Sequence, residues 1–174
     1  MNWEDVQGWL SSAEGAELQR LAAGNTVLEI GSLFGRSTVC MAETGATIVA
    51  VDPHDGFSLA DSKWHNVDSL ATLRANLAQH AVDNQVVVIA APIQAIARHL
   101  TRSFDLAFVD GDHSHAACLR DCQIAERLVR PGGVIAVHDY RSGYADHAGV
   151  TSGVDAWRGD RRPRRVKSLA VFQL

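Results

Sequence analysis

Acidic or histidine side chains lie at the ends of four of the five most apolar segments of the chain, or directly after them. These four sequences are Glu29-Ile30-Gly31-Ser32, Asp52-Pro53-His54, Asp110-Gly111-Asp112-His113 and His138-Asp139-Tyr140, whereas the remaining segment ends in Ala91-Pro92. A single acid in such a place is explained by helix capping, but four together favour a ligand site. Carboxylates attract a cationic ligand, and a histidine, with a reference pKa of about 6.5, can accept a proton near neutral pH.

A glycine-containing bend at residues 31–35 narrows the kind of ligand. A dinucleotide fingerprint requires G-x-G-x-x-G, and Leu33 and Arg36 occupy the places of its second and third glycines. A phosphate loop requires G-x-x-x-x-G-K-[ST], whereas the stretch from Gly31 to Thr38 is one residue short and has arginine for lysine. Glu29 would also repel phosphates. A nucleotide hydrolase with a degenerate phosphate loop is therefore kept only as an alternative.

The third interpretation is a nucleoside ligand that has a cationic centre and no phosphate. Glu29 would attract such a ligand, and glycine allows the backbone to approach it closely. Asp52 lies 21 residues after Gly31, at the end of the second predicted strand, where an acid binds ribose hydroxyls. This interpretation accounts for Glu29, for the glycines of the bend and for Asp52.

Five apolar segments alternate with helical patterns along the chain. Strands are predicted at 26–30, 47–51, 86–90, 104–109 and 134–137, with one or two more in 165–173. Helices are predicted within 3–23 (two short ones, the second opened by a capping box at Ser11 and Glu14), at 36–43, around Leu70, Leu73 and Leu77, from Pro92 to Leu100, and at 116–129, with loops at 54–63 and 130–133. The strand cores are continuously apolar, which indicates burial on both faces. The fold class is therefore α/β, a doubly wound, mostly parallel sheet with helices on both faces, and ligands are expected beyond the carboxyl ends of the strands.

Length and composition set the limits of the assignment. The 174 residues suit one domain, 1–174, and 47% hydrophobic with 21% charged residues is typical of a folded globular chain. Within it we expect N-terminal helices over 1–25, a ligand-binding core over 26–157, and a basic loop with C-terminal strands over 158–174. The acidic first residues lack the positive region of a secretory signal, no apolar run approaches the roughly 20 residues of a membrane span, and a cytoplasmic protein is expected.

The net charge of −4 gives no overall attraction for nucleic acid. The exception is the basic cluster, which we define as the six cations between positions 158 and 167: Arg158, Arg161, Arg162, Arg164, Arg165 and Lys167. A solvated loop and a docking patch for an anionic substrate or partner both remain open for it.

S-adenosylmethionine matches the third interpretation, since it has a ribose, an ammonium group and a sulfonium but no phosphate. At this point the chain resembles the class I, Rossmann-like methyltransferases. The segment 29–37 is similar to the first motif of the catechol O-methyltransferase type, and 130–133 is similar to the loop before their fifth strand. The segments 108–113 and 138–140 resemble a bacterial branch that includes macrolide-sugar O-methyltransferases. The resemblance spans about 26–157.

The resemblance implies roles for particular residues. Glu29 and the backbone of Gly31 and Ser32 would hold the methionine part of the cofactor, with Ser37 near its carboxylate. Asp52 would bind the ribose hydroxyls. The full set of implied cofactor residues is Glu29, Gly31, Ser32, Gly35, Ser37, Asp52, Ala91, Pro92 and Asp110, with Ala91 and Pro92 beside the adenine.

The resemblance also implies a catalytic group. His113 falls where a general base sits, and Asp110 and Asp139 match metal-ligand positions, so that all three are expected to be catalytic. A divalent cation, Mg²⁺ or another, would be held by Asp110, His138 and Asp139. His138 stands where these relatives carry a carboxylate, which makes the site less suited to a hard ion.

The expected activity is methyl transfer to a hydroxyl group of a small molecule, a sugar or other polyol. A homodimer would cover an otherwise open crevice. Two further alternatives are a non-catalytic cofactor-binding module and, resting only on the basic cluster, a methyltransferase acting on nucleic acid.

Overall fold

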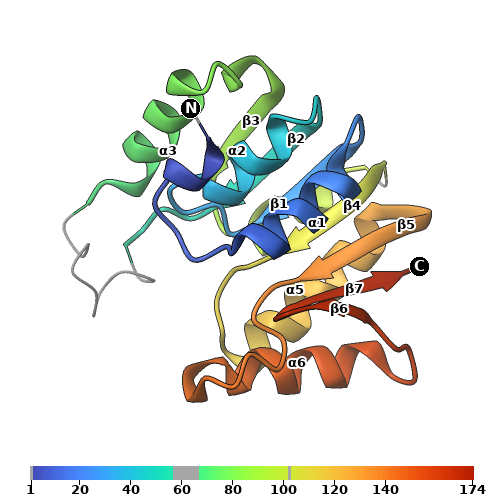
Figure 1. Ribbon diagram of the computed structural model, residues 1–174. Coiled ribbons are helices and arrows are strands. Elements are labelled where there is room, and N and C mark those ends of the chain that lie inside the picture. Colours follow the sequence, from blue (N-terminus) through green and yellow to red (C-terminus); the bar gives the residue numbers. More distant parts are fainter. Residues whose placement is uncertain (1, 57–66, 102) are drawn as a thin grey trace.

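A seven-stranded sheet lies between two layers of helices (Figure 1), and the computed structural model describes residues 2–56, 67–101 and 103–174. The strands are β1 (Thr26–Ile30), β2 (Thr47–Asp52), β3 (Val86–Ala90), β4 (Phe104–Val109), β5 (Val129–Val137), β6 (Arg164–Val166) and β7 (Leu169–Gln173). Their order is β3-β2-β1-β4-β5-β7-β6. The first five strands are parallel, β7 pairs antiparallel with β5, and β6 pairs antiparallel with β7. The predicted doubly wound α/β fold is confirmed.

Helices cover both faces of the sheet. One layer holds α1 (Ser12–Ala22), α2 (Arg36–Ala42) and α3 (Ser69–Gln79), and the other holds α4 (Ile93–Ile96), α5 (His115–Leu128) and α6 (Ala148–Arg158). Short 3₁₀ turns are η1 (Trp3–Asp5), η3 (Asp83–Gln85), η4 (Ala97–His99) and η5 (Ala145–His147). No helix in the described part of the chain is long and apolar enough to cross a membrane.

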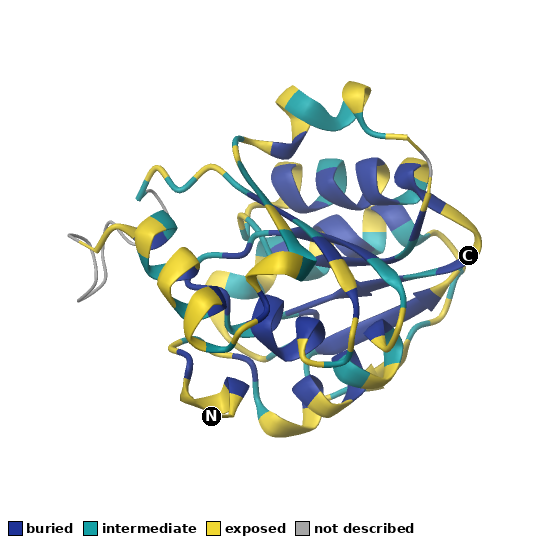
Figure 2. Cartoon of the chain, turned by 90° about the horizontal axis from the view of Figure 1, so that it is seen from above, coloured by how far each residue is buried: buried dark blue, intermediate teal, exposed yellow. Residues whose placement is uncertain are grey.

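The strands supply two hydrophobic cores, one on each face. Val27 and Phe108 belong to the core under α1–α3, whereas Leu28 and Val109, their neighbours in the chain, belong to the core under α4–α6. Successive side chains of a strand point to opposite faces, so a strand that is covered on both sides must be apolar throughout. Figure 2 shows the buried strands between helices whose outer faces are exposed.

Two expectations about the elements need correction, and one helix was missed. The expected loop at 130–133 lies inside β5, because Val129 already pairs with Phe104, and the register then shifts so that Val134 pairs with Leu106. The helix expected from Pro92 to Leu100 is two short pieces, α4 and η4. Helix α6 was not anticipated.

The sheet reverses its winding between the parallel neighbours β1 and β4. The strands that follow β1 in the sequence, β2 and β3, lie on one side of this pair, and those that follow β4 lie on the other. Such a switch point opens a crevice beyond the carboxyl ends of the strands. Gly31 and Asp110, the first residues after β1 and β4, meet there: the Asp110 N–H donates to the carbonyl of Ile30 at 2.8 Å.

Candidate active site

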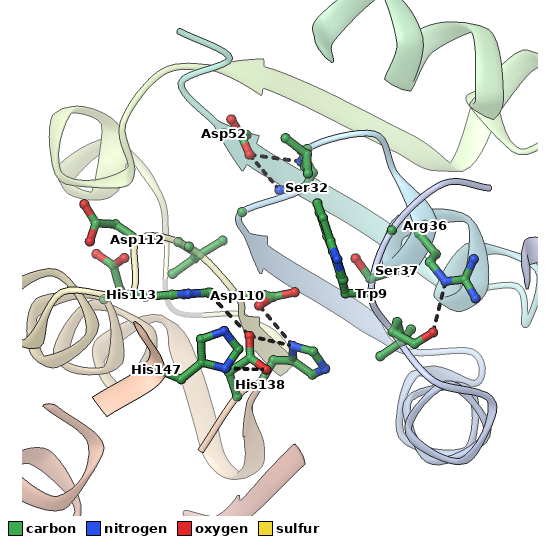
Figure 3. Close-up of a pocket in the computed structure, with 18 of the residues that line it drawn as sticks. Trp9, Ser32, Arg36, Ser37, Asp52, Asp110, Asp112, His113, His138 and His147 are labelled. Carbon is green, nitrogen blue, oxygen red and sulfur yellow. Dashed lines mark hydrogen bonds and ion pairs between the residues drawn. The ribbon is translucent and has the colours of Figure 1, made fainter. Parts of the chain in front are cut away.

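A cavity of about 1210 Å³ occupies this crevice. It is lined by the loops after β1, β2, β4 and β5, by the segment before α1, and by the turn between β6 and β7. Figure 3 labels side chains that surround this space, among them Trp9 from the segment before α1, Ser32 after β1, and Asp110 and His138 after β4 and β5.

The bend after β1 forms one wall of the cavity. Gly31 has φ +89°, and a Cβ there would lie 2.1 Å from the Asp110 carbonyl oxygen, so only glycine fits. The backbone N–H groups of Ser32 and Leu33 both donate to Asp52 Oδ2 at 3.0 Å (Figure 3). The Asp52 carboxylate therefore holds the bend in shape. The buried Ser32 hydroxyl has no hydrogen-bond partner within the described residues.

Glu29 lies behind the bend rather than on the cavity wall. It is fully buried, and it accepts hydrogen bonds from the hydroxyls of Ser37 at 2.5 Å and Thr38 at 2.6 Å. Burial raises the pKa of Glu29 to about 7 despite those two hydrogen bonds. The sequence argument placed this carboxylate in direct contact with a ligand, whereas the structure leaves Ser37 as its link to the cavity.

Three carboxylates surround the buried His138. Its Nδ1 lies 3.3 Å from Asp110 Oδ1 and 3.4 Å from Asp139 Oδ2, and its Nε2 lies 3.6 Å from Glu14 Oε2. Burial alone would lower the pKa of His138, but the negative charge of Asp110 and the contacts with Asp139 and Glu14 raise it well above its ordinary value. Burial likewise opposes ionisation of Asp139, yet the neighbouring His138 brings its pKa below the usual range.

Asp139 also gathers two further histidines. His113 Nε2 lies 3.4 Å from Asp139 Oδ2, and His147 Nδ1 lies 3.2 Å from Asp139 Oδ1 (Figure 3). The rings of His113 and His147 meet edge to face, 4.6 Å between centroids. Asp110, His138 and Asp139 form one group with the spacing of metal ligands, and His113, Asp139 and His147 form a second.

Most of the residues proposed from the sequence come together at this cavity. Those that line it are Gly31, Ser32, Ser37, Asp52, Pro92, Asp110, His113, His138 and Asp139. Glu29, Gly35 and Ala91 are not among the lining residues of the described chain. Gly35 instead permits close packing, because a Cβ there would lie 2.4 Å from a methyl group of Leu73.

Two site residues were missed by the sequence analysis. His147 ends η5 and precedes α6, and the spacing of Val150, Val154 and Trp157 by four and three residues would have indicated that helix. Glu14 was recognised only as part of a capping box. It does accept hydrogen bonds from the Ser11 N–H and hydroxyl, but its burial against His138, on a distant segment, has no local signal.

The fold and the site define the class of the protein. A Rossmann-like sheet with a glycine bend after β1, an acid after β2 and acidic loops after β4 and β5 is the arrangement of class I methyltransferases. A family model described as a methyltransferase domain matches residues 28–140, more than half of the chain. The chain belongs to this family.

Solved structures agree on the fold. The chain is similar to cofactor-bound Rv0187 from MTB (24% identity, TM-score 0.77, covering 97% of this chain and 83% of that one). It is also similar to a putative O-methyltransferase from Klebsiella pneumoniae (20% identity, TM-score 0.74, covering 98% of this chain and 84% of that one). A third similar structure is an O-methyltransferase from Bacillus cereus in complex with SAH (21% identity, TM-score 0.71, covering 98% of this chain and 86% of that one).

Proposed function

We propose that this methyltransferase moves the methyl group of S-adenosylmethionine to a hydroxyl group of a small molecule, a sugar or other polyol. The observation that carries the proposal is the placement of His113 across one cavity from the bend and Asp52. A donor-binding wall and a group able to accept a proton thus face the same space. The Bacillus cereus structure, an O-methyltransferase in complex with SAH, supports the choice of donor and of oxygen as acceptor.

The residues of the bend suit S-adenosylmethionine. The unpartnered Ser32 hydroxyl offers a buried polar atom at the cavity wall, and a buried polar group without a partner is costly unless a ligand supplies one. Asp52 Oδ1 accepts one hydrogen bond, from the His54 N–H at 2.8 Å, and keeps capacity for a ribose hydroxyl. The bound donor supplies a methyl group on a positively charged sulfur, which the acidic residues around the cavity favour.

The residues also suit a divalent cation. Neither ring nitrogen of the buried His138 has a hydrogen-bond partner within the described residues. Its Nδ1 lies 3.3 and 3.4 Å from two carboxylate oxygens, and ligands bound to one ion at about 2.1 Å lie about 3.0–3.4 Å apart. Asp110, His138 and Asp139 would hold the ion, which would lower the pKa of a coordinated substrate hydroxyl.

His113 acts as the general base in this proposal. It takes the proton of the acceptor hydroxyl as the oxygen forms its bond to the methyl carbon and the carbon–sulfur bond breaks. Asp139, 3.4 Å from Nε2, orients the ring and stabilises the imidazolium that results. A positioned base of this kind contributes about 10²–10⁴-fold to the rate, and holding donor and acceptor in line contributes further.

Calorimetry with S-adenosylmethionine, S-adenosylhomocysteine and ATP tests the donor. We expect saturable binding of the first two and none of ATP. Transfer of a labelled methyl group to a panel of sugars, polyols and catechols then tests the reaction. Binding of ATP in preference to S-adenosylmethionine would favour the hydrolase alternative, and donor binding without transfer to any hydroxyl would favour the non-catalytic module. Sedimentation of the same samples tests the homodimer, which stays a prediction.

A further inference from the structure

The basic cluster divides into two parts in the structure. Three of its members are paired with carboxylates: Arg158 with Asp155, Arg161 with Glu126, and Arg164 with Glu17. Arg162 is exposed and does not line the cavity. Only Arg165 and Lys167 line it. Half of the charge of the cluster is thus neutralised by carboxylates, and two of the three remaining cations line the cavity.

Arg165 is held in place without a carboxylate partner among the described residues. Its guanidinium donates to the backbone carbonyl of Lys167 at 2.9 Å and to that of Arg141 at 3.4 Å, and it lies over the Tyr140 ring at 5.8 Å. Tyr140 is buried, so the guanidinium rests on a fixed surface. Backbone carbonyls orient a guanidinium but leave its positive charge uncompensated.

The ammonium group of Lys167 forms no ion pair or hydrogen bond with any described residue. It stands in the turn between β6 and β7 with φ +51°, and the next residue, Ser168, is fixed by donating its N–H and hydroxyl to Glu14. Arg141 adds a third positive charge to this wall, although it is shared with Asp155 at 3.4 Å.

We propose that the methyl acceptor carries an anionic group, a phosphate ester or a carboxylate, which Arg165 and Lys167 bind. This inference rests on the proposed function and specifies the acceptor. It rests on the two kinds of charge that line one cavity: Asp110, Asp112 and Asp139 come from the loops after β4 and β5, and Arg165 and Lys167, which have no carboxylate partner among the described residues, come from the β6–β7 hairpin. An anionic group on the acceptor is favoured beside the hairpin, while the donor occupies the bend and Asp52.

The test uses the protein saturated with S-adenosylhomocysteine, so that the carboxylate of the donor is already in place. Inorganic phosphate and acetate are titrated separately while backbone amide resonances are followed by NMR. We expect saturable shifts centred on Arg165, Lys167 and Ser168 for at least one of the anions. Phosphate alone would indicate a phosphorylated acceptor, and acetate alone a carboxylated one.

Matched variants test whether Arg165 and Lys167 are the residues that bind the anion. Lys167→Gln is expected to weaken anion binding at least fivefold, because it removes an ammonium group that is paired with no carboxylate of the described chain. Arg162→Gln removes the same charge from the same cluster outside the cavity and should leave binding within a factor of two. Arg165→Gln should act like Lys167→Gln, but its packing on Tyr140 makes Lys167 the decisive position.

Three results would overturn the inference: no saturable shift with either anion, equal weakening in Arg162→Gln and Lys167→Gln, or anion binding that appears only without S-adenosylhomocysteine. In the last case the wall would serve the carboxylate of the donor. The affinity for S-adenosylhomocysteine, measured on the same samples, separates the two proposals. If S-adenosylhomocysteine does not bind, the proposed function is contradicted. If it binds but neither anion does, only this inference is contradicted.

Discussion

Asp139 is the residue on which the chemistry of the site converges. Three histidines lie within 3.2–3.4 Å of its two oxygens, and its backbone is held at φ +58°, a conformation that few residues other than glycine adopt. Asparagine and aspartate tolerate it better than most. The carboxylate lies between His138, His113 after β4 and His147 at the end of η5, and so connects the three rings.

His113 is predicted to be essential for turnover and dispensable for donor binding. His113→Gln removes the proton acceptor, and we expect kcat to fall by about 10²–10⁴-fold while the dissociation constant for S-adenosylhomocysteine stays within a factor of two. His115→Gln is the matched control, because His115 starts α5 two residues later, bonds to Ser152 and does not line the cavity. Turnover of His113→Gln within a factor of five of the wild type would place the base elsewhere.

Metal dependence is predicted to pass through Asp110. EDTA should reduce turnover of the wild-type protein, and an added divalent cation should restore it. Asp110→Asn replaces an anionic ligand by a neutral one, so its residual turnover should respond to neither treatment. Metal analysis of the purified proteins provides a second readout, with less bound ion in the variant. Wild-type turnover that is unaffected by EDTA, in protein shown to be free of metal, would exclude a metal-assisted step.

At the scale of elements, the contact between β1 and β4 makes the crevice. The two strands end side by side, and the chain after each turns away, so that Gly31 and Asp110 meet backbone to backbone. The sequence analysis assigned Gly31 to close approach of a ligand. The structure gives it a second reason, which is the approach of the neighbouring loop.

Gly31→Ala is predicted to damage both stability and donor binding. The new Cβ would meet the Asp110 carbonyl at 2.1 Å in addition to the strain of φ +89°. Gly45→Ala is the control, because Gly45 has φ +81° but nothing within 4 Å of a Cβ. We expect Gly45→Ala to cost about 1–2 kcal/mol of unfolding free energy from backbone strain alone, and Gly31→Ala to cost more. Denaturant unfolding and calorimetry measure the two effects. Equal costs would mean that the Asp110 loop relaxes without penalty.

The strands, and the site residues at their carboxyl ends, could be predicted because their sequence signals are local. Continuous apolar runs such as Val86–Ala90 indicate buried parallel strands, and the ends of parallel strands lie at one edge. Helix α6 contains two glycines and no side-chain cap at its start, which concealed it and, with it, the position of His147 beside Asp139. The burial of Glu29 and the contact between Glu14 and His138 depend on packing between distant segments, which residue spacing does not encode.

At the scale of the whole molecule, Glu14 connects the N-terminal helix with the C-terminal hairpin and the site. It is buried in α1, accepts hydrogen bonds from Ser168 beside β7, and faces His138 at the end of β5. Burial disfavours its charge, but contacts with His138, Ser11 and Ser168 prevail and hold the pKa of Glu14 well below its ordinary value. The ionised form therefore stabilises the fold, and this contribution is present above about pH 4.5 and lost as the pH falls.

Glu29 acts in the opposite direction. Burial raises its pKa from 4.5 to about 7, so the folded state holds its proton more tightly than the unfolded chain does. The contribution of Glu29 is complete below pH 4.5 and is lost as the pH rises to about 7, which corresponds to about 3 kcal/mol. The raised pKa of His138 has the same sign, and its contribution declines further above pH 6.5.

These opposing contributions predict a maximum of stability near pH 5 for the ligand-free protein. Urea unfolding of the wild type between pH 4 and pH 8 should show a rise on the acid side and a decline toward neutrality. Glu14→Gln should flatten the acid side, and Glu29→Gln should flatten the decline between pH 4.5 and 7, since a neutral amide does not titrate. Each variant is the control for the other, because both replace a buried glutamate by glutamine. A decline in Glu29→Gln as steep as in the wild type would assign it to other groups, His138 first among them.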